Sequence, residues 1–532
     1  MDRRTYLSAL GAGLALTAGC NQPTDDDPTE WPDGSEVPPG TATETRTTST
    51  PAGSPTTTPD PFEREVDVVE DLGCDPGGEE PCGATLASAA EGKSLFRFPA
   101  GTYRFEEHTV LVELSSIGFV GEGDVTFLPP KGFNHRLLTV YAGTILFENI
   151  DVDLSASNTT AGMTLIAQDR LRVEGVQFRG RGDHRDPQVV NALSLGVRDP
   201  QGKGIVRNLV ARKGSAIGHY KNGNGRVGVW VGHNHGGVLR LENCRLEQFG
   251  NNAIYASRCP GRVHVVDSTL RNNNVSSVRI SGAGSYAENV DIEVDLRKYD
   301  GPRTRMDDQF NTRGIIVEQK NAEKPPGAEV RNCDVRILNS PSSQDVIDVG
   351  NTGRSLAVRD TNIRIDVDGT PAVWKKSPQK DGDNSVVLEN VTITGDAAGS
   401  SAVFLNGAEN SVLRNCTIEQ TGSLRDGITL VNSPRSLVDG GSVDTTGYPL
   451  VLEVEDEFPP CLFMLGSTPQ FETEVEDLTD ASKVVSSRSS LGENDCFDGN
   501  LLDGVSDSAV DRIAVLRVSR NEVALFHLDD SS

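Results

Sequence analysis

Two short patterns of apolar and polar residues alternate along most of the chain. The first pattern reads apolar, any residue, Asn or Asp, any two residues, apolar, and successive copies are 22 to 43 residues apart. The copies are FENIDVDL at Asn149, VRNLVA at Asn208, LENCRLE at Asn243, VVDSTLR at Asp267, AENVDIEV at Asn289, VRNCDVRI at Asn332, VRDTNIRI at Asp360, LENVTIT at Asn390, LRNCTIE at Asn415 and LVDGGSV at Asp439, with a degenerate copy, VEGVQF, at Gly175. This pattern does not have the 3.6-residue period of a helix, and neither does the second pattern described next.

The second pattern is a strand-like segment that lies between these copies. Its examples are VGVWVGH, NAIYASR, SSVRISG, RGIIVEQ, DVIDVGN, PAVWKKS, SAVFLNG, DGITLVN and YPLVLEV. Each alternates apolar and polar residues with the period of two that a half-buried β-strand requires, and each is bounded by Gly, Asn or Ser.

The repeat unit therefore holds two or three short strands, which are too few to close a sheet alone. Such units bury their inner faces only by stacking on their neighbours, so the sequence predicts an all-β, parallel β-solenoid. The repeated Asn predicts a ladder of stacked, hydrogen-bonded side-chain amides at one turn. Cys244, Cys333 and Cys416 each follow a ladder residue, and we expect them to pack in the interior as small apolar side chains.

The segment VDVVEDLGCDPGGEEPCGATLASAAEGKSLFRFPAGTYRF resembles the N-terminal entry of right-handed parallel β-helix proteins of the pectate-lyase-like superfamily. The resemblance covers residues 63–456 and implies a single-stranded right-handed parallel β-helix. It also implies a short helix, from about Ala84 to Glu91, that caps the open end of the core, followed by a strand with Phe98 to Tyr103. Residues 457–532 lose the repeat and contain one convincing hairpin, IAVLRVSRNEVALFHL, so a small β-rich C-terminal extension is expected to cover the other end.

The first 20 residues have the features of an export signal. Arg3 and Arg4 precede a short apolar stretch and the sequence LTAGC, which resembles a twin-arginine lipoprotein signal in which Cys20 is lipidated. Residues 21–62 are rich in Thr, Pro, Ser and Asp and predict a disordered tether. The combination predicts a protein on the extracellular face of the cell membrane, held through a lipid on Cys20, or secreted.

Charge and cysteine content restrict the class of partner. The chain carries 77 acidic and 50 basic residues, a formal net charge of −27. This excess argues against nucleic acid as a partner, because phosphate binding needs a basic surface. The acidic, arginine-rich composition resembles that of exported proteins of salt-loving archaea. An oxidising location allows disulfides, for which Cys74 with Cys82 and Cys461 with Cys496 are the plausible pairs.

The candidate site follows from aligning the second pattern. One position in it is always apolar and must face the core, so the next residue must face outward. That outward column reads Trp230, Tyr255, Arg279, Ile316, Asp348, Trp374, Phe404, Thr429 and Val451. A solvent-facing column with four aromatic residues predicts a carbohydrate-binding face, and the alternative is that loops cover it.

The neighbouring outward positions and strand ends add charged side chains to this face. We expect Trp230, Tyr255, Trp374, Phe404, Arg258 and Lys376 to bind a polysaccharide, and Arg279, Asp348, Glu318, Lys320 and His233 to be the candidate catalytic residues. In a lyase reaction, Arg279, Lys320 or His233 would act as the base while Asp348 and Glu318 held calcium. In a hydrolase reaction, Asp348 and Glu318 would be the paired carboxylates.

The sequence does not identify the activity within the superfamily. Polygalacturonases of this fold carry N-T-D, D-D, G-H-G and R-I-K motifs. Here Gly232-His233 is followed by Asn, and Arg279-Ile280 by Ser. No catalytic residue is therefore carried over, and an enzyme, a non-catalytic glycan-binding adhesin and a structural envelope protein all remain open.

The stretch VGVWVGHNHGG shows how the repeat changes a local interpretation. His233 and His235 alone suggest a metal site, yet in the repeat Val229 and Val231 face the core and both histidines fall in a glycine-rich turn. We therefore expect no two-histidine metal site. His233 is retained as a residue at the edge of the groove, and Trp230 is the stronger functional candidate.

Overall fold

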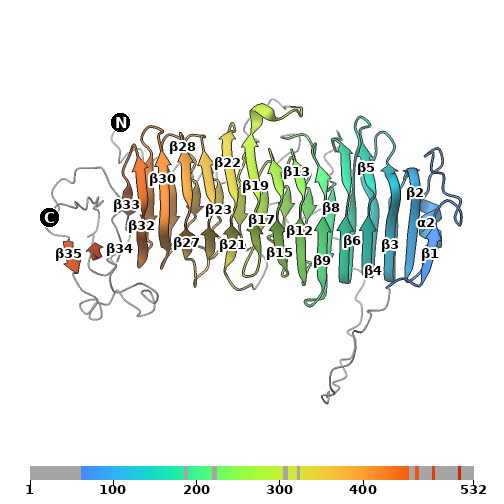
Figure 1. Ribbon diagram of the computed structural model, residues 1–532, viewed down its shortest axis with the longest axis horizontal. Helices are drawn as coiled ribbons and strands as arrows, with labels where there is room; N and C mark the ends of the chain where they lie inside the picture. The colour runs from blue at the N-terminus through green and yellow to red at the C-terminus, as the bar shows by residue number, and fades with distance from the viewer. Residues whose placement is uncertain are drawn as a thin grey trace, which may run out of the picture.

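The computed structural model describes residues 61–184, 190–217, 225–302, 310–319 and 324–453, and the backbone of three short strands beyond them. The described chain winds into an elongated solenoid whose turns lie side by side along one axis (Figure 1). No helix in these ranges is both long and apolar enough to cross a membrane. The predicted signal, the tether, Cys20, Lys320 and the Cys461–Cys496 pair lie outside the described residues.

Each turn contributes strands to three faces, which are named A, B and C here. Face A includes β1 (Arg64–Asp67), β9 (Lys203–Arg207), β12 (Val238–Glu242), β15 (Arg262–Val266), β18 (Tyr286–Glu288), β21 (Ala328–Arg331), β24 (Leu356–Arg359) and β27 (Val386–Glu389). Face B includes β5 (Asp151–Leu154), β7 (Gln177–Gly180), β10 (Val210–Ala211), β13 (Arg245–Glu247), β16 (Thr269–Arg271), β19 (Asp291–Asp295), β22 (Asp334–Asn339), β25 (Asn362–Ile365) and β28 (Thr392–Gly395). Face C includes β8 (Leu193–Val197), β11 (Val229–Trp230), β14 (Ile254–Tyr255), β17 (Val278–Ile280), β20 (Ile315–Val317), β23 (Ile347–Val349), β26 (Val373–Lys375), β29 (Ser401–Asn406), β31 (Asp426–Val431) and β33 (Leu450–Glu453).

Six longer strands pass through more than one face. They are β2 (Ser94–Arg104), β3 (Thr109–Leu128), β4 (Asn134–Glu148), β6 (Thr160–Glu174), β30 (Val412–Gln420) and β32 (Ser436–Thr445). Every strand on the three faces pairs in parallel with its counterparts on the neighbouring turns, as β14 pairs with β11 and β17. The predicted right-handed parallel β-helix is therefore the fold of this chain.

The corner between faces A and B is a ladder of left-handed residues. The non-glycine ladder residues with positive φ at this corner are Asn149, Asn208, Asn243, Asp267, Asn289, Asn332, Asp360, Asn390 and Asn415, with φ between +49° and +56°. Asn is among the non-glycine residues that tolerate this conformation best. The side chains also bond from turn to turn: Asn332 Nδ2 donates to Asn289 Oδ1 at 2.6 Å, and Asn289 Nδ2 donates to Asp267 Oδ1 at 2.8 Å. The predicted ladder is confirmed.

The last copy of the ladder motif is one residue out of register with the prediction. Arg414 pairs with Asp439, so the residue opposite Asn415 is Gly440, whose φ is +65°. Asp439 instead lies on the outer surface and accepts a hydrogen bond from Arg414 Nε at 2.9 Å. Glycine takes the left-handed conformation without the steric cost of a Cβ, which explains why it replaces Asn here.

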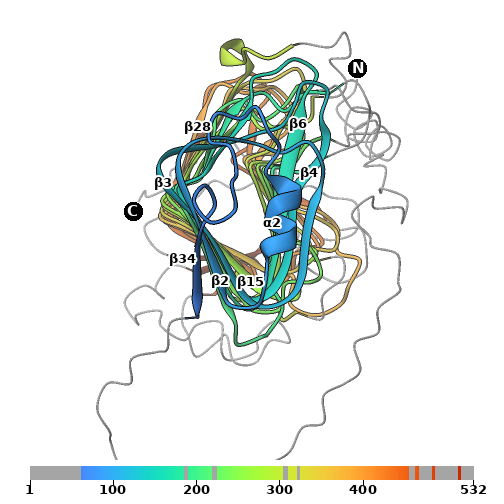
Figure 2. The same ribbon diagram turned by 90° about the vertical axis from the view of Figure 1, so that its right-hand side faces the viewer.

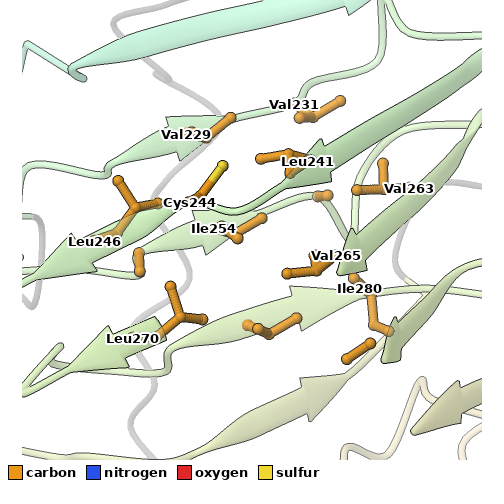
Figure 3. Close-up of a cluster of buried hydrophobic side chains, with 14 of the residues drawn as sticks. Val229, Val231, Leu241, Cys244, Leu246, Ile254, Val263, Val265, Leu270 and Ile280 are labelled. Carbon is orange, nitrogen blue, oxygen red and sulfur yellow. The ribbon is translucent and has the colours of Figure 1, made fainter. Parts of the chain in front are cut away.

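The residue after each ladder position points into the core. Cys244, Cys333 and Cys416 are buried and unpaired, as predicted. Burial raises the pKa of the Cys244 thiol to about 12, because a thiolate there would lose its hydration. Figure 3 shows Cys244 among the inward side chains of successive turns, including Val229, Ile254 and Leu246.

The N-terminal end of the core is closed by helix α2 (Gly83–Ala89), which lies across the opening in the end view (Figure 2). Leu86, a residue of this helix, is fully buried. A disulfide joins Cys74 to Cys82, with 5.3 Å between the Cα atoms, and so fixes the start of the helix. Both the cap and this disulfide agree with the sequence prediction.

The C-terminal end departs from the parallel arrangement. Strand β34 (Leu462–Leu465) still pairs in parallel with β32. Strand β36 (Ile513–Leu516) then runs antiparallel to both β34 and β35 (Ser482–Val485). The β-rich extension is therefore present. The second half of the predicted hairpin lies outside the described residues.

We expect Asn332→Ala to lower the free energy of unfolding by about 2 kcal/mol. An alanine at φ +49° is strained by about 1–2 kcal/mol, and the bond to Asn289 is lost at about 1 kcal/mol. Chemical denaturation followed by circular dichroism measures the change. Asn332→Gly is the control, because it keeps the backbone conformation and should lose only the hydrogen bond. Equal stability of both variants and the wild type would show that the ladder contributes nothing.

Candidate functional site

The alignment that defined the site is confirmed by the strand register on face C. Val229 pairs with Ile254 and Ile254 with Val278, and the same column continues without a shift to Leu450. Every residue of this core column is at most 2% exposed. The next residue on each strand therefore forms the predicted outward column from Trp230 to Val451.

The outward column is not exposed along its whole length, and in this respect the prediction was wrong. Trp230, Arg279, Trp374 and Phe404 are half-buried. Tyr255, Ile316, Asp348, Thr429 and Val451 are buried, with between 3% and 6% of their surface exposed. Side chains in one column are only about 4.8 Å apart, so long ones cover their neighbours. The column is consequently divided into two separate aromatic clusters.

The first cluster, called the Trp230 cluster here, consists of Trp230, Tyr255 and Arg258. The two rings meet edge to face with 4.5 Å between their centroids. Arg258 Nε donates a hydrogen bond to Tyr255 Oη at 3.1 Å, and its guanidinium lies 5.7 Å from the Trp230 ring. No described carboxylate lies within ion-pairing distance of Arg258. The cluster thus offers an aromatic surface and a cation whose charge is not balanced by a described residue.

Arg279 is held tightly beside this cluster. Its guanidinium lies 4.4 Å from the centre of the Tyr255 ring, and Nη2 forms a 2.6 Å ion pair with Glu318 Oε2. Ser257 Oγ donates to the other Glu318 oxygen at 2.7 Å. An adjacent carboxylate stabilises the protonated guanidinium. Arg279 is therefore better suited to binding a ligand than to accepting a proton.

The second cluster, called the Trp374 cluster, consists of Trp374, Phe404 and Lys376. The two rings are 6.2 Å apart in an edge-to-face arrangement. Lys376 Nζ lies 4.9 Å from the Trp374 ring centre and forms a 2.7 Å ion pair with Asp348 Oδ2. The cation is therefore shared between the aromatic surface and a buried carboxylate.

Below Lys376 lies a buried pair of carboxylates that the sequence analysis missed. Asp345 and Asp348 both approach Arg313 Nε, at 3.4 and 3.3 Å, and both approach Lys376 Nζ, at 4.0 and 2.7 Å. Burial, and next the charge of Asp348, raise the pKa of Asp345 well above the usual range of an aspartate. Both oxygens of Asp345 are buried without a hydrogen-bond partner. The D-x-x-D spacing in QDVIDVG was the available signal, but Asp345 precedes the strand and its alternation.

Lys375 also departs from the pattern, because it occupies a core position between Val349 and Leu405. Its side chain is fully buried, and Nζ donates to the carbonyl oxygens of Gly353 and Lys376 at 3.1 and 3.2 Å. Burial lowers the pKa of Lys375 to about 8. Alternation places this position in the core, where an apolar residue is expected, so the burial of a lysine here was not predicted.

The structure separates the two histidines of the glycine-rich turn. His233 is exposed at the edge of face C. His235 is fully buried, where Nδ1 accepts a hydrogen bond from Val197 N at 3.2 Å and Nε2 lies 3.1 Å from Arg262 O. Burial lowers the pKa of His235 to about 4, so it is neutral at neutral pH. Its role is structural, and the expectation that the pair is not a metal site agrees with this separation.

The predicted calcium ligands do not converge with a third acidic group. Within the described ranges, no three His, Cys, Asp or Glu side chains are grouped so that they could hold a metal ion. Asp348 and Glu318 are instead each engaged by a cation. Lys320, the remaining candidate base, lies outside the described residues.

Comparisons with known proteins assign no family to this chain. No protein-family model matches the chain, and no curated protein matches it by sequence. Solved structures that resemble it include the surface adhesin PfbA of Streptococcus pneumoniae (11% identity, 80% of this chain and 97% of that one, TM-score 0.42). A second is the A-module of the mannuronan C-5 epimerase AlgE4 of Azotobacter vinelandii, at 13% identity over 74% of this chain and 98% of that one, with a TM-score of 0.34. A third is a family 28 exopolygalacturonase of Yersinia enterocolitica, at 10% identity over 75% of this chain and 79% of that one, with a TM-score of 0.33. Similarity this low carries no functional argument.

We expect stability to fall between pH 6.5 and pH 4 because of His235. Its pKa is about 4 in the folded chain and about 6.5 when unfolded, so the unfolded state binds the proton first as the pH falls. The loss should reach about 3 kcal/mol near pH 4 and then level off. Denaturation midpoints at pH 7 and pH 4 measure it. His235→Gln should lack this part of the pH dependence, and an identical pH dependence in the variant would contradict the assignment.

Proposed function

We propose that this protein binds a polysaccharide along face C. The observation that carries the proposal is the placement of two aromatic and cationic clusters on one straight column. Trp230 and Trp374 are five strands apart, or about 24 Å at the usual strand spacing. Half-buried aromatic rings offer an apolar face for a sugar ring, and neighbouring polar groups orient its hydroxyls.

Binding fits the geometry better than cleavage does. Four charged groups on this face are already paired: Arg279 with Glu318, and Lys376 with Asp348. Such pairs hold their side chains in fixed positions, which suits a preformed binding surface. The cations on this face favour a glycan that carries acidic groups. Export and a lipid anchor at Cys20 remain predictions that would place this surface outside the cell, facing its ligand.

Trp230→Ala and Trp374→Ala should each weaken glycan binding by about tenfold or more, because each removes an aromatic surface that contacts the ligand. Affinity electrophoresis in gels that contain uronate polysaccharides measures the change, with and without calcium. Tyr286→Ala is the matched control, since Tyr286 is a half-buried aromatic residue on face A, stacked on His264. Equal retardation of all three variants and the wild type would exclude face C as the binding surface.

Hydrolysis is a second candidate function, and Asp345 is the observation that favours it. A carboxyl group with a raised pKa beside a second carboxyl group resembles the pair of carboxyl groups that glycosidases use. Asp345 is fully buried, so Lys376 would have to move before a substrate could reach it.

If the protein cleaves glycans, Asp348→Asn should reduce the release of new reducing ends by at least about a hundredfold while binding persists. The assay compares reducing-end release with absorbance from unsaturated lyase products over the same glycans. Asp366→Asn is the control, because Asp366 is an acidic residue paired with Arg364 outside face C. Binding without any turnover by the wild type would exclude this second function.

A further inference from the structure

A small pocket opens on face C beside Trp230, at the end of the aligned column. Trp230 pairs with Ser194, and Ser194 with Thr164, so these three side chains follow one another along the outward column. The pocket has a volume of about 50 Å³. A water molecule needs roughly 10–15 Å³ measured in this way, so the space admits a group of a few atoms and not a whole sugar ring.

Some of the side chains that line the pocket have no hydrogen bond to a described residue. Thr164 is 7% exposed, and its Oγ1 is buried without a hydrogen-bond partner. Ser194, His233 and Trp230 line the same space, and none of their side chains forms a hydrogen bond with a described residue. A buried hydroxyl group without a hydrogen-bond partner lowers the free energy of unfolding by about 1–3 kcal/mol, and native proteins seldom contain such a group. These groups are therefore arranged for something that enters the pocket.

The glycines of the turn shape this space. A Cβ on Gly232 would lie 2.8 Å from Trp230 Nε1, so only glycine at this position leaves the indole N–H in its present place. Gly232, in the glycine-rich turn that also holds His233 and His235, is therefore needed for the position of Trp230.

The charge of the lining is opposite to that of the chain. Arg136 and His233 contribute to the wall, and none of the described residues that line it is acidic. This is unusual in a chain with 77 acidic and 50 basic residues. A lining of donors and a cation stabilises oxygen atoms that carry negative charge.

We infer that this pocket binds the anionic substituent, a carboxylate or a sulfate, of a sugar whose ring lies against Trp230. Oxygen atoms of that group would accept hydrogen bonds from Thr164 and Ser194, beside the positively charged Arg136 in the pocket wall. The inference rests on the proposed function, because it names the chemistry of one subsite on the binding face. It makes Thr164 and Ser194 residues that determine specificity for charged over neutral glycans.

The test uses three matched polymers: a polyuronate, the same polymer with its carboxyl groups reduced to alcohols, and a sulfated derivative of that neutral polymer. Isothermal titration calorimetry with the whole protein measures the affinity of each. The wild type should bind at least one charged polymer about tenfold more tightly than the neutral one. The sulfated and carboxylated polymers then distinguish which anion the pocket accepts.

Thr164→Val should remove most of this preference with little effect on the neutral polymer, and Ser194→Ala should do the same if the first variant folds poorly. Thr429→Val is the control, because Thr429 lies on the same column about 40 Å away and its hydroxyl is bonded to Ser401. Equal affinity of the wild type for charged and neutral polymers would overturn this inference alone. Loss of preference in the control as well would also overturn it. No binding to any polymer would overturn the proposed function together with it.

Discussion

The stacking of each turn on its neighbours, in register, is the constraint on which this structure depends. A turn of two or three short strands has no core of its own, so its inner face is buried only when the next turn places an apolar residue directly above it. The left-handed corner with its Asn and Asp ladder maintains this register, because it turns the chain at the same point in every repeat. Where Gly440 replaces Asn, the corner persists without the side-chain bond.

The same stacking determines what the outer surface of face C can present. Residues in one column are so close that an arginine or lysine covers the side chain beside it, as Arg279 covers Tyr255. The column therefore offers two half-open aromatic clusters with fixed cations instead of a continuous aromatic stripe. A rigid surface of this kind loses little conformational entropy when a ligand binds. It therefore favours ligands whose groups match the fixed positions of its side chains.

Buried charges show where face C departs from a purely structural solenoid. Asp345 and Lys375 lie where apolar residues would be more stable, and both have pKa values shifted toward neutrality by burial. Ion pairs and backbone carbonyls compensate for only part of this cost. Asp345 and Lys375 lie beside the Trp374 cluster, whereas the hydroxyl of Thr164, which has no hydrogen-bond partner, lies in the pocket beside Trp230. The two ends of the face are thus chemically different.

The sequence alone determined the fold class, the ladder and the register of the core column, because these follow from residue periodicity that repeats in every turn. The helical cap was expected only from the resemblance of the N-terminal segment to the entry of other β-helix proteins. The sequence also identified the outward column, since alternation along a strand is a local rule. It could not show that Tyr255 and Asp348 are covered, that Arg279 is paired with Glu318, or that Asp345, Thr164 and Lys375 belong to the site. Those features depend on which side chains from turns 20 to 60 residues apart meet above the strands, and only the packed tertiary structure decides that.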